Sequence, residues 1–168
     1  MRWACTIQFV VIGKALILLM VANSVPVVLG NIFGSKFAHA IDGGRRFVDG
    51  RPLFGRSKTW RGLAGSLLST TLCAPLLGVP WYVGALFALS VMAGDLLSSF
   101  LKRRLGKAPS SRVIGLDQIP EALLPLLACQ AWLDLPWFEI TVCVIIFMVL
   151  ELSFAPLFYW LRLKNRPY

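Results

Sequence analysis

The stretch YVGALFALSVMAGDLLSSFLKRR, residues 82–104, decides the fold class. Its first part, 82–101, is a mostly apolar run about as long as the roughly 20 residues that a helix needs to cross a bilayer. Three cations follow it at once, and the one acid inside the run is Asp95. A carboxylate at that depth is costly in lipid unless it faces protein, water or a metal ion. The stretch therefore predicts a membrane-spanning helix that carries polar chemistry near one end.

The rest of the chain has the composition of a membrane protein. Of its 168 residues 57% are apolar, and the mean hydropathy is +0.72. The length leaves room for one domain. We therefore predict an all-α integral membrane protein, a single polytopic domain over residues 1–168 with about five transmembrane helices. The apolar runs are 7–33, 62–79, 82–101, 118–133 and 137–161, and the short connections between them, 79–81 and 134–136, predict tight hairpins.

The basic residues predict how the spans are oriented. The chain has 17 Lys and Arg against 8 acids, a formal charge of +9. The loops at about 34–61 and 102–117 and the C-terminal tail hold 15 of the 17 cations. Because basic residues near span ends favour the cytosol, we predict a plasma-membrane protein with its N-terminus outside and its C-terminus in the cytosol. Lys14, inside the first run, either snorkels outward or faces the bundle interior.

Other residue patterns exclude several classes of site. Cys5, Cys73, Cys129 and Cys143 lie alone in apolar runs without CxxC spacing, which predicts neither a disulfide framework nor a zinc site. His39 is the only histidine, so a multi-histidine metal site is excluded. Residues 55–59, GRSKT, are similar to the end of a P-loop, but the upstream glycine is missing and we reject an NTPase.

Two aspartates are candidate metal ligands. On a helix Asp95, Ser99 and Lys102 lie on one stripe near the cytosolic end. Asp117 opens the next apolar run, and the loop before it can fold back to bring it beside Asp95. Two carboxylates without a histidine or thiolate nearby suit Mg²⁺, which shares its other positions with substrate phosphates. The alternatives are that Asp95 only pairs with Lys102 or Arg103, and that Asp117 is only a helix-start residue.

The first basic loop predicts binding of a polyphosphate. Residues 41–62, IDGGRRFVDGRPLFGRSKTWRG, place glycines among arginines and lysines. Glycines let backbone N–H groups approach an anion closely, and the cations neutralise it. The alternative is a basic patch that sets topology and rests on anionic lipid headgroups.

Three polar residues inside or beside the spans have weaker patterns. Asn23 with Pro26 forms either a polar notch in the first span or a tolerated kink. Glu121 is interpreted as a first-turn acid. Glu151 lies inside the last span and must face the bundle, either at a substrate cavity or in a structural hydrogen bond.

Seven short motifs follow one another along the chain: IDGG at 41–44, FVDGR at 47–51, LFG at 53–55, KTWRG at 58–62, GD at 94–95, KRRLG at 102–106 and LDQ at 116–118. In this order they resemble those of the CDP-archaeol synthase family, over about residues 22–168. That family is similar in its Gly-Asp, Ser, Lys-Arg and Asp pattern to the catalytic half of bacterial phosphatidate cytidylyltransferases.

The resemblance implies transfer of CMP from CTP to an isoprenoid ether-lipid phosphate, with release of pyrophosphate. Mg²⁺ held by Asp95 and Asp117 would neutralise the developing charge. The implied partners are CTP, the lipid phosphate and membrane lipids; a homodimer is an option and no nucleic acid is expected. The candidate catalytic residues are Asp95, Asp117 and Lys102, and the candidate substrate-binding residues are Asn23, Asp42, Asp49, Gly50, Arg51, Lys58, Thr59, Arg61, Ser99 and Arg103.

One motif departs from the family. The pattern Leu-Phe-Gly-Asp-Gly-Lys-Thr has Arg56 and Ser57 here in place of its acid and second glycine. The acceptor could therefore be phosphatidate or another lipid phosphate, in a bacterial owner. A transporter would spread polar residues through several spans, and a non-catalytic scaffold would tolerate loss of Asp95 and Asp117.

Overall fold

The computed structural model describes residues 8–108, 111 and 113–160, and the regular secondary structure of these residues is helical, with two isolated β-bridges in the loops. The predicted all-α class is confirmed. Among the residues discussed above, Cys5, Arg112, Arg162, Lys164 and Arg166 lie outside the described ranges. The helices are α1 (Phe9–Phe33), α2 (Trp60–Leu76), α3 (Trp81–Arg104), α4 (Gln118–Ala128), α5 (Gln130–Leu133) and α6 (Trp137–Trp160).

The predicted spans and the helices agree except in one place. The fourth span, predicted as one segment over 118–133, is broken at Cys129, where α4 ends after 11 residues and α5 begins. Within the described residues two helices, α1 and α3, are long and apolar enough to cross a membrane. At 17 residues α2 falls just short of that length. The helix positions are therefore as predicted, while the count of five spans stays a prediction.

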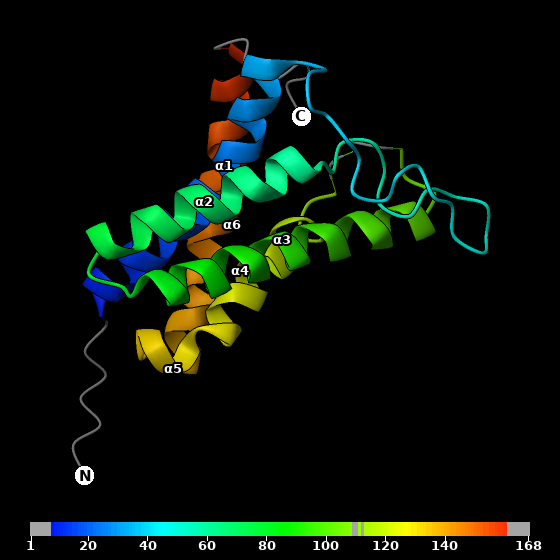
Figure 1. Cartoon of the computed structure of the whole chain (residues 1–168). Helices are drawn as coiled ribbons and strands as arrows, with labels where there is room; N and C mark the ends of the chain where they lie inside the picture. Colours follow the sequence, from blue (N-terminus) through cyan, green and yellow to red (C-terminus); the bar gives the residue numbers. More distant parts are fainter. Residues whose placement is uncertain (1–7, 109–110, 112, 161–168) are drawn as a thin grey trace.

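Small residues let α2, α3 and α4 pack closely, and Figure 1 shows the three side by side. A methyl group added at Gly84 would lie 2.5 Å from Cβ of Ala74 on α2. One added at Gly94 would lie 2.3 Å from the carbonyl oxygen of Pro120 on α4. Such close backbone approach is typical of helices packed within a membrane.

A proline in α1 is compensated by its neighbour α2. Pro26 has no N–H, so the carbonyl of Ala22, four residues earlier, lacks its helical donor. The hydroxyl of Ser66 on α2 donates to that carbonyl at 2.9 Å. Asn23 donates from its side-chain amide to the carbonyl of Leu19 at 3.1 Å, within its own helix. In this structure Asn23 therefore bonds to α1 itself.

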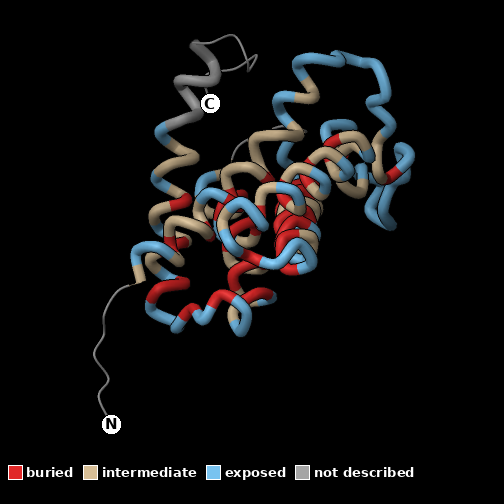
Figure 2. The backbone as a smooth tube through the Cα atoms, turned by 60° about the vertical axis from the view of Figure 1, so that its left-hand side comes forward, coloured by how far each residue is buried: buried red, intermediate tan, exposed pale blue. Residues whose placement is uncertain are grey.

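The helices bury an apolar core and leave apolar faces exposed. Figure 2 shows buried residues where the helices meet. The side chains of Phe87 on α3 and Phe147 on α6 are fully buried. On α2, Leu68, Leu72 and Leu76 lie four residues apart and are all exposed, the last to 85%. Contiguous exposed apolar faces of this kind suit a lipid environment.

The long loop before α2 lies at the end of α3 where that helix terminates. Figure 1 shows this loop, drawn in cyan, beside the C-terminal end of α3. The opposite end of α3 begins at the tight turn after α2, as predicted for 79–81. Lys14 of α1 reaches this turn, with Nζ 3.6 Å from a Cβ built on Gly78. Lys14 thus lies at the end of the bundle opposite the basic loop.

Candidate active site

An ion pair joins the basic loop to the middle of α3. Nζ of Lys58 donates to both carboxylate oxygens of Asp95, at 2.5 and 2.6 Å. Burial alone would lower the pKa of Lys58, but the Asp95 carboxylate, with Glu121 and Asp117 further away, raises its pKa above the ordinary value. Sequence reasoning offered Lys102 or Arg103 as the structural partner of Asp95. The partner is instead a lysine from the candidate polyphosphate loop.

A second ion pair lies about two turns further along α3. Nζ of Lys102 is 2.7 Å from Oδ1 of Asp117, and the two side chains are 9% and 12% exposed. The other carboxylate oxygen of Asp117 accepts the N–H of Val113 at 3.0 Å. Asp117 stands just before α4 but makes no cap bond to that helix. Its carboxylate is therefore turned toward α3, which a plain helix-start acid would not require.

The two aspartates are brought together because the chain folds back between α3 and α4. Gly94 packs against the Pro120 carbonyl, so the start of α4 lies against the turn of α3 that carries Asp95. Both Asp95 and Asp117 act electrostatically on Lys58. Ser99, one turn beyond Asp95, is buried. We call the pairs Lys58–Asp95 and Lys102–Asp117 the inner pairs.

Glu121 belongs to the same cluster, which sequence reasoning missed. Its side chain is buried and hydrogen-bonds that of Asp95, and Glu151 of α6 lies close enough to Glu121 to act on it electrostatically. Carboxylates from α3, α4 and α6 thus meet inside the bundle. The four-residue spacing of Asp117 and Glu121, which places both on one helix face, was the signal available in the sequence.

The cluster supplies oxygen donors but no preformed metal cage. Within the described residues no three His, Cys, Asp or Glu side chains are grouped so as to hold a metal ion. Oδ1 of Asp117 is buried, and although it lies beside Lys102 it accepts no hydrogen bond. Two carboxylates with an acceptor of this kind fit Mg²⁺, which is bound by one or two carboxylates and completed by water and substrate phosphates.

The loop that carries Lys58 is held in shape by Asp42. One carboxylate oxygen accepts the N–H of Gly44 at 2.9 Å, and the other accepts those of Phe54 and Gly55 at 3.1 and 2.9 Å. Partial burial opposes ionisation, but these backbone donors outweigh it and lower the pKa of Asp42 below its ordinary value. Asp42 was predicted to contact substrate, and in this structure both of its carboxylate oxygens accept hydrogen bonds from the loop backbone.

A second contact fixes the hairpin of residues 45–53 on the end of α3. The guanidinium of Arg104 pairs with Asp49 and lies over the rings of Phe47 and Phe100, at 4.7 and 5.0 Å. In return Nη1 of Arg51 donates to the carbonyl of Arg104 at 2.6 Å. We call these five residues the outer latch. Gly50 is the hairpin turn, with a positive φ of 75° that favours glycine.

The remaining predicted binding residues also make local contacts. Oγ1 of Thr59 accepts the N–H of Gly62 at 3.2 Å and caps α2. Arg61 donates to the carbonyl oxygens of Gly34 and Lys36 at the end of α1, at 3.1 and 2.5 Å. Arg103 donates to the carbonyl of Ala108 at 2.8 Å, while its Nε and Nη1 are buried without a hydrogen-bond partner. Arg61 keeps one buried donor unused, its Nε, and Arg103 keeps two.

An all-helical bundle with exposed apolar faces and a buried cluster of acids and lysines at one end defines an intramembrane enzyme as the class of protein. A solved structure described as an intramembrane enzyme for archaeal membrane lipids biosynthesis matches it with a TM-score of 0.66 and 26% identity. The match covers 82% of this chain and 90% of that one. The family model for CarS-like CDP-archaeol synthase matches residues 8–168, and the chain belongs to this family.

Curated relatives of high similarity carry the same family name. The chain is 33% identical to a CDP-archaeol synthase of Pyrococcus furiosus over 157 residues, which covers 88% of this chain and 90% of the relative. It is 39% identical to one from Hyperthermus butylicus over 123 residues, covering 68% and 70%. The family resemblance inferred from the seven motifs is thereby confirmed.

Proposed function

We propose that the protein is a CTP-dependent cytidylyltransferase that converts an isoprenoid glycerol ether-lipid phosphate into a CDP-archaeol-type lipid. A phosphate oxygen of the lipid attacks the α-phosphorus of CTP, the bond from that phosphorus to the β-phosphate bridging oxygen breaks, and pyrophosphate leaves. The observation that carries the proposal is the contact between Lys58 of the glycine-rich loop and Asp95 of α3, because it joins the loop that we propose binds phosphate to the acid cluster.

Mg²⁺ is the proposed cofactor, with Asp95 and Asp117 as its protein ligands. When bound it would supply charge neutralisation for the triphosphate, as divalent ions do in phosphoryl transfer generally. Glu121, hydrogen-bonded to Asp95, would keep that carboxylate oriented.

The chain's own cations serve the phosphates. Lys58 and Lys102 each sit on a carboxylate, so either ammonium can turn to a phosphate oxygen without crossing the site. The buried, unused Nε and Nη1 of Arg103 are donors suited to a phosphate. We assign the loop side of the triphosphate to Lys58 and the α3 side to Lys102 and Arg103.

The membrane arrangement is part of the proposal. With the basic loops in the cytosol, CTP reaches the site from water while the lipid phosphate arrives within the leaflet. We propose five spans, the shorter α2 and the pair α4 and α5 included, in the plasma membrane with the N-terminus outside. A homodimer stays a prediction.

The test is CMP incorporation from labelled CTP into lipid. Purified protein in detergent with Mg²⁺ would be offered unsaturated archaetidic acid and phosphatidic acid side by side, with Asp95→Asn as the control. We expect product with the ether lipid that the control fails to make. Equal product from Asp95→Asn would reject the proposed site, and a folded protein with no product from either lipid would reject the reaction.

A further inference from the structure

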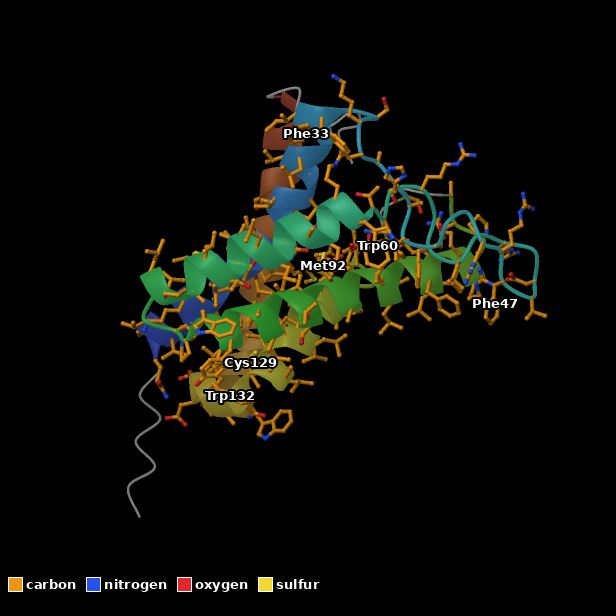
Figure 3. The ribbon with its side chains drawn as sticks, viewed as in Figure 1. Phe33, Phe47, Trp60, Met92, Cys129 and Trp132 are labelled. Atoms are coloured by element: carbon orange, nitrogen blue, oxygen red, sulfur yellow. The ribbon has the colours of Figure 1, made fainter. Side chains whose placement is uncertain are left out.

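The hairpin of residues 45–53 exposes two apolar side chains at its tip. Phe47 is 43% exposed and Val48 96% exposed, although both stand in a strongly basic loop. Figure 3 shows Phe47 at the end of the molecule far from Cys129 and Trp132. An exposed valine beside an exposed phenylalanine at a loop tip indicates contact with an apolar partner, either a protein or a membrane.

The position of the hairpin along α3 points to the membrane surface as that partner. The edge-on contact between the rings of Phe47 and Phe100, with centroids 5.4 Å apart, fixes the tip against this helix. Tyr82 and Phe100 are separated by about 27 Å of helix rise. This is close to the roughly 30 Å hydrocarbon thickness of a bilayer. If the exposed Trp81 and Tyr82 lie at one membrane surface, Phe100 lies at the other.

The tip also continues the lipid-facing side of α3. Leu86, Leu89 and Leu97 are exposed along that helix at helical spacing, and Phe100 follows three residues later. Phe47 lies on Phe100 and under the guanidinium of Arg104. The exposed apolar residues of α3 therefore lead up to Phe100, on which the hairpin tip rests.

Charge completes the pattern. Arg45 and Arg46 immediately precede the apolar pair and are exposed. Neither forms an ion pair with any acid among the described residues, whereas Asp49 of the same hairpin is taken by Arg104. Basic side chains beside a shallow apolar tip suit a surface of anionic lipid headgroups.

We propose that the hairpin tip, Phe47 and Val48 with Arg45 and Arg46, is seated in the headgroup layer of an anionic bilayer. The loop that bears Lys58 is then fixed on both sides, by the outer latch to α3 and by the tip to lipid. This holds the loop at the depth where the phosphate of a membrane-bound molecule lies. The seating does not depend on which reaction the site catalyses.

The test uses photocrosslinking of the full chain in nanodiscs. The photoreactive residue p-benzoylphenylalanine replaces Val48, or Ser57 as a matched exposed control in the same loop. Intact-protein mass after illumination reports whether lipid is attached. We expect a lipid adduct at position 48 and little at position 57, with more adduct in discs containing phosphatidylglycerol than in phosphatidylcholine alone. Neutralising Arg45 and Arg46 with glutamine should lower the adduct by about fivefold for each arginine.

Three results would overturn the proposal. Equal lipid adduct at positions 48 and 57 would show that the tip contacts lipid no more than the rest of the loop does. Equal adduct in the two kinds of disc, unaffected by Arg45→Gln and Arg46→Gln, would show that the tip does not recognise anionic headgroups. An adduct with the mass of a second protein chain would mean that a protein covers the tip. Because Val48 is almost fully exposed, its replacement leaves the packing of the chain intact.

Discussion

Two charged clusters lie toward the same end of α3 and are built in opposite ways. In the inner pairs, lysines meet carboxylates in partly or fully buried positions, at 2.5 and 2.7 Å. In the outer latch, the guanidinium groups of Arg51 and Arg104 meet backbone carbonyls and aromatic rings, and the one carboxylate involved is 39% exposed. The inner pairs concentrate charge at a place where a phosphate could replace the carboxylate that is paired with a lysine. The outer latch only positions the loop, so the two clusters should respond differently to mutation.

The largest effect on folding is expected where a buried charge loses its partner. Asp117→Asn leaves Lys102 uncompensated at 9% exposure. Removing one partner of a buried pair costs about 3–5 kcal/mol, so we expect a clear drop in thermal stability in detergent together with loss of CMP transfer. Asp134→Asn is the matched control, because this exposed residue has a left-handed conformation that asparagine also adopts. An unchanged melting temperature for Asp117→Asn would contradict the buried inner pair.

The close approach of α3 and α4 gives the next prediction. In Gly94→Ala the new methyl group would meet the Pro120 carbonyl carbon at 2.6 Å and Cα of Glu121 at 2.8 Å. Because these are backbone atoms, α4 must move away from Asp95, at a cost of about 1–3 kcal/mol. Gly13→Ala in α1 is the control, since nothing lies within 4 Å of its new methyl group. Thermal unfolding measures both, and equal stability of the two variants would show that α4 does not rest on Gly94.

Mutation of the outer latch should have a smaller effect, and the effect should be on KM for CTP. Arg104→Lys keeps the charge but loses the planar group that covers Phe47 and Phe100. With cation–π contacts worth about 1 kcal/mol, we expect KM for CTP to rise about fivefold while kcat stays close to that of the natural protein. Arg56→Lys, at an exposed loop position, should leave both constants unchanged. A large loss of kcat in Arg104→Lys would mean that the outer latch takes part in the chemical step, which would contradict its assignment as a positioning contact.

The smallest effect is the response of the loop to acid. Because the pKa of Asp42 is lowered in the folded protein, its contribution to stability is present above the unfolded value of 3.8 and is lost as pH falls through the lower folded value. Hydrogen exchange at Gly44, Phe54 and Gly55 should therefore accelerate below about pH 4, relative to the same amides in Asp42→Asn at each pH. No difference between the two proteins across this range would mean that the carboxylate does not hold the loop.

The positions of the helices were predictable because runs of apolar residues of span length have few other structures available in lipid. The break at Cys129 was not, since neither Cys129 nor its neighbours carry a sequence signal for ending a helix there. The closeness of Asp95 and Asp117 followed from a short returning loop. Their lysine partners did not, because Lys58 reaches Asp95 across 37 residues of sequence. Such pairings depend on the path of the whole loop.

Two cases show what sequence patterns leave open. Glu121 is a first-turn acid of α4, as predicted, and close packing at Gly94 also brings it next to Asp95. Asp42, Asp49 and Arg51 lie in the family motif and were predicted to bind substrate, yet each is engaged in shaping or docking the loop. A motif marks where residues matter, but only the fold separates those that face the site from those that hold it.

The central claim is that the inner pairs carry chemistry and the outer latch carries position, and paired variants test it most directly. CMP transfer would be measured in Asp95→Asn and Asp49→Asn at saturating CTP and Mg²⁺, with thermal stability recorded for each. We expect Asp95→Asn to lose about a hundredfold or more of the rate, as expected for a lost electrostatic contact at the reacting group, and Asp49→Asn to stay within about threefold. Similar losses of rate in the two folded variants would contradict the division of roles.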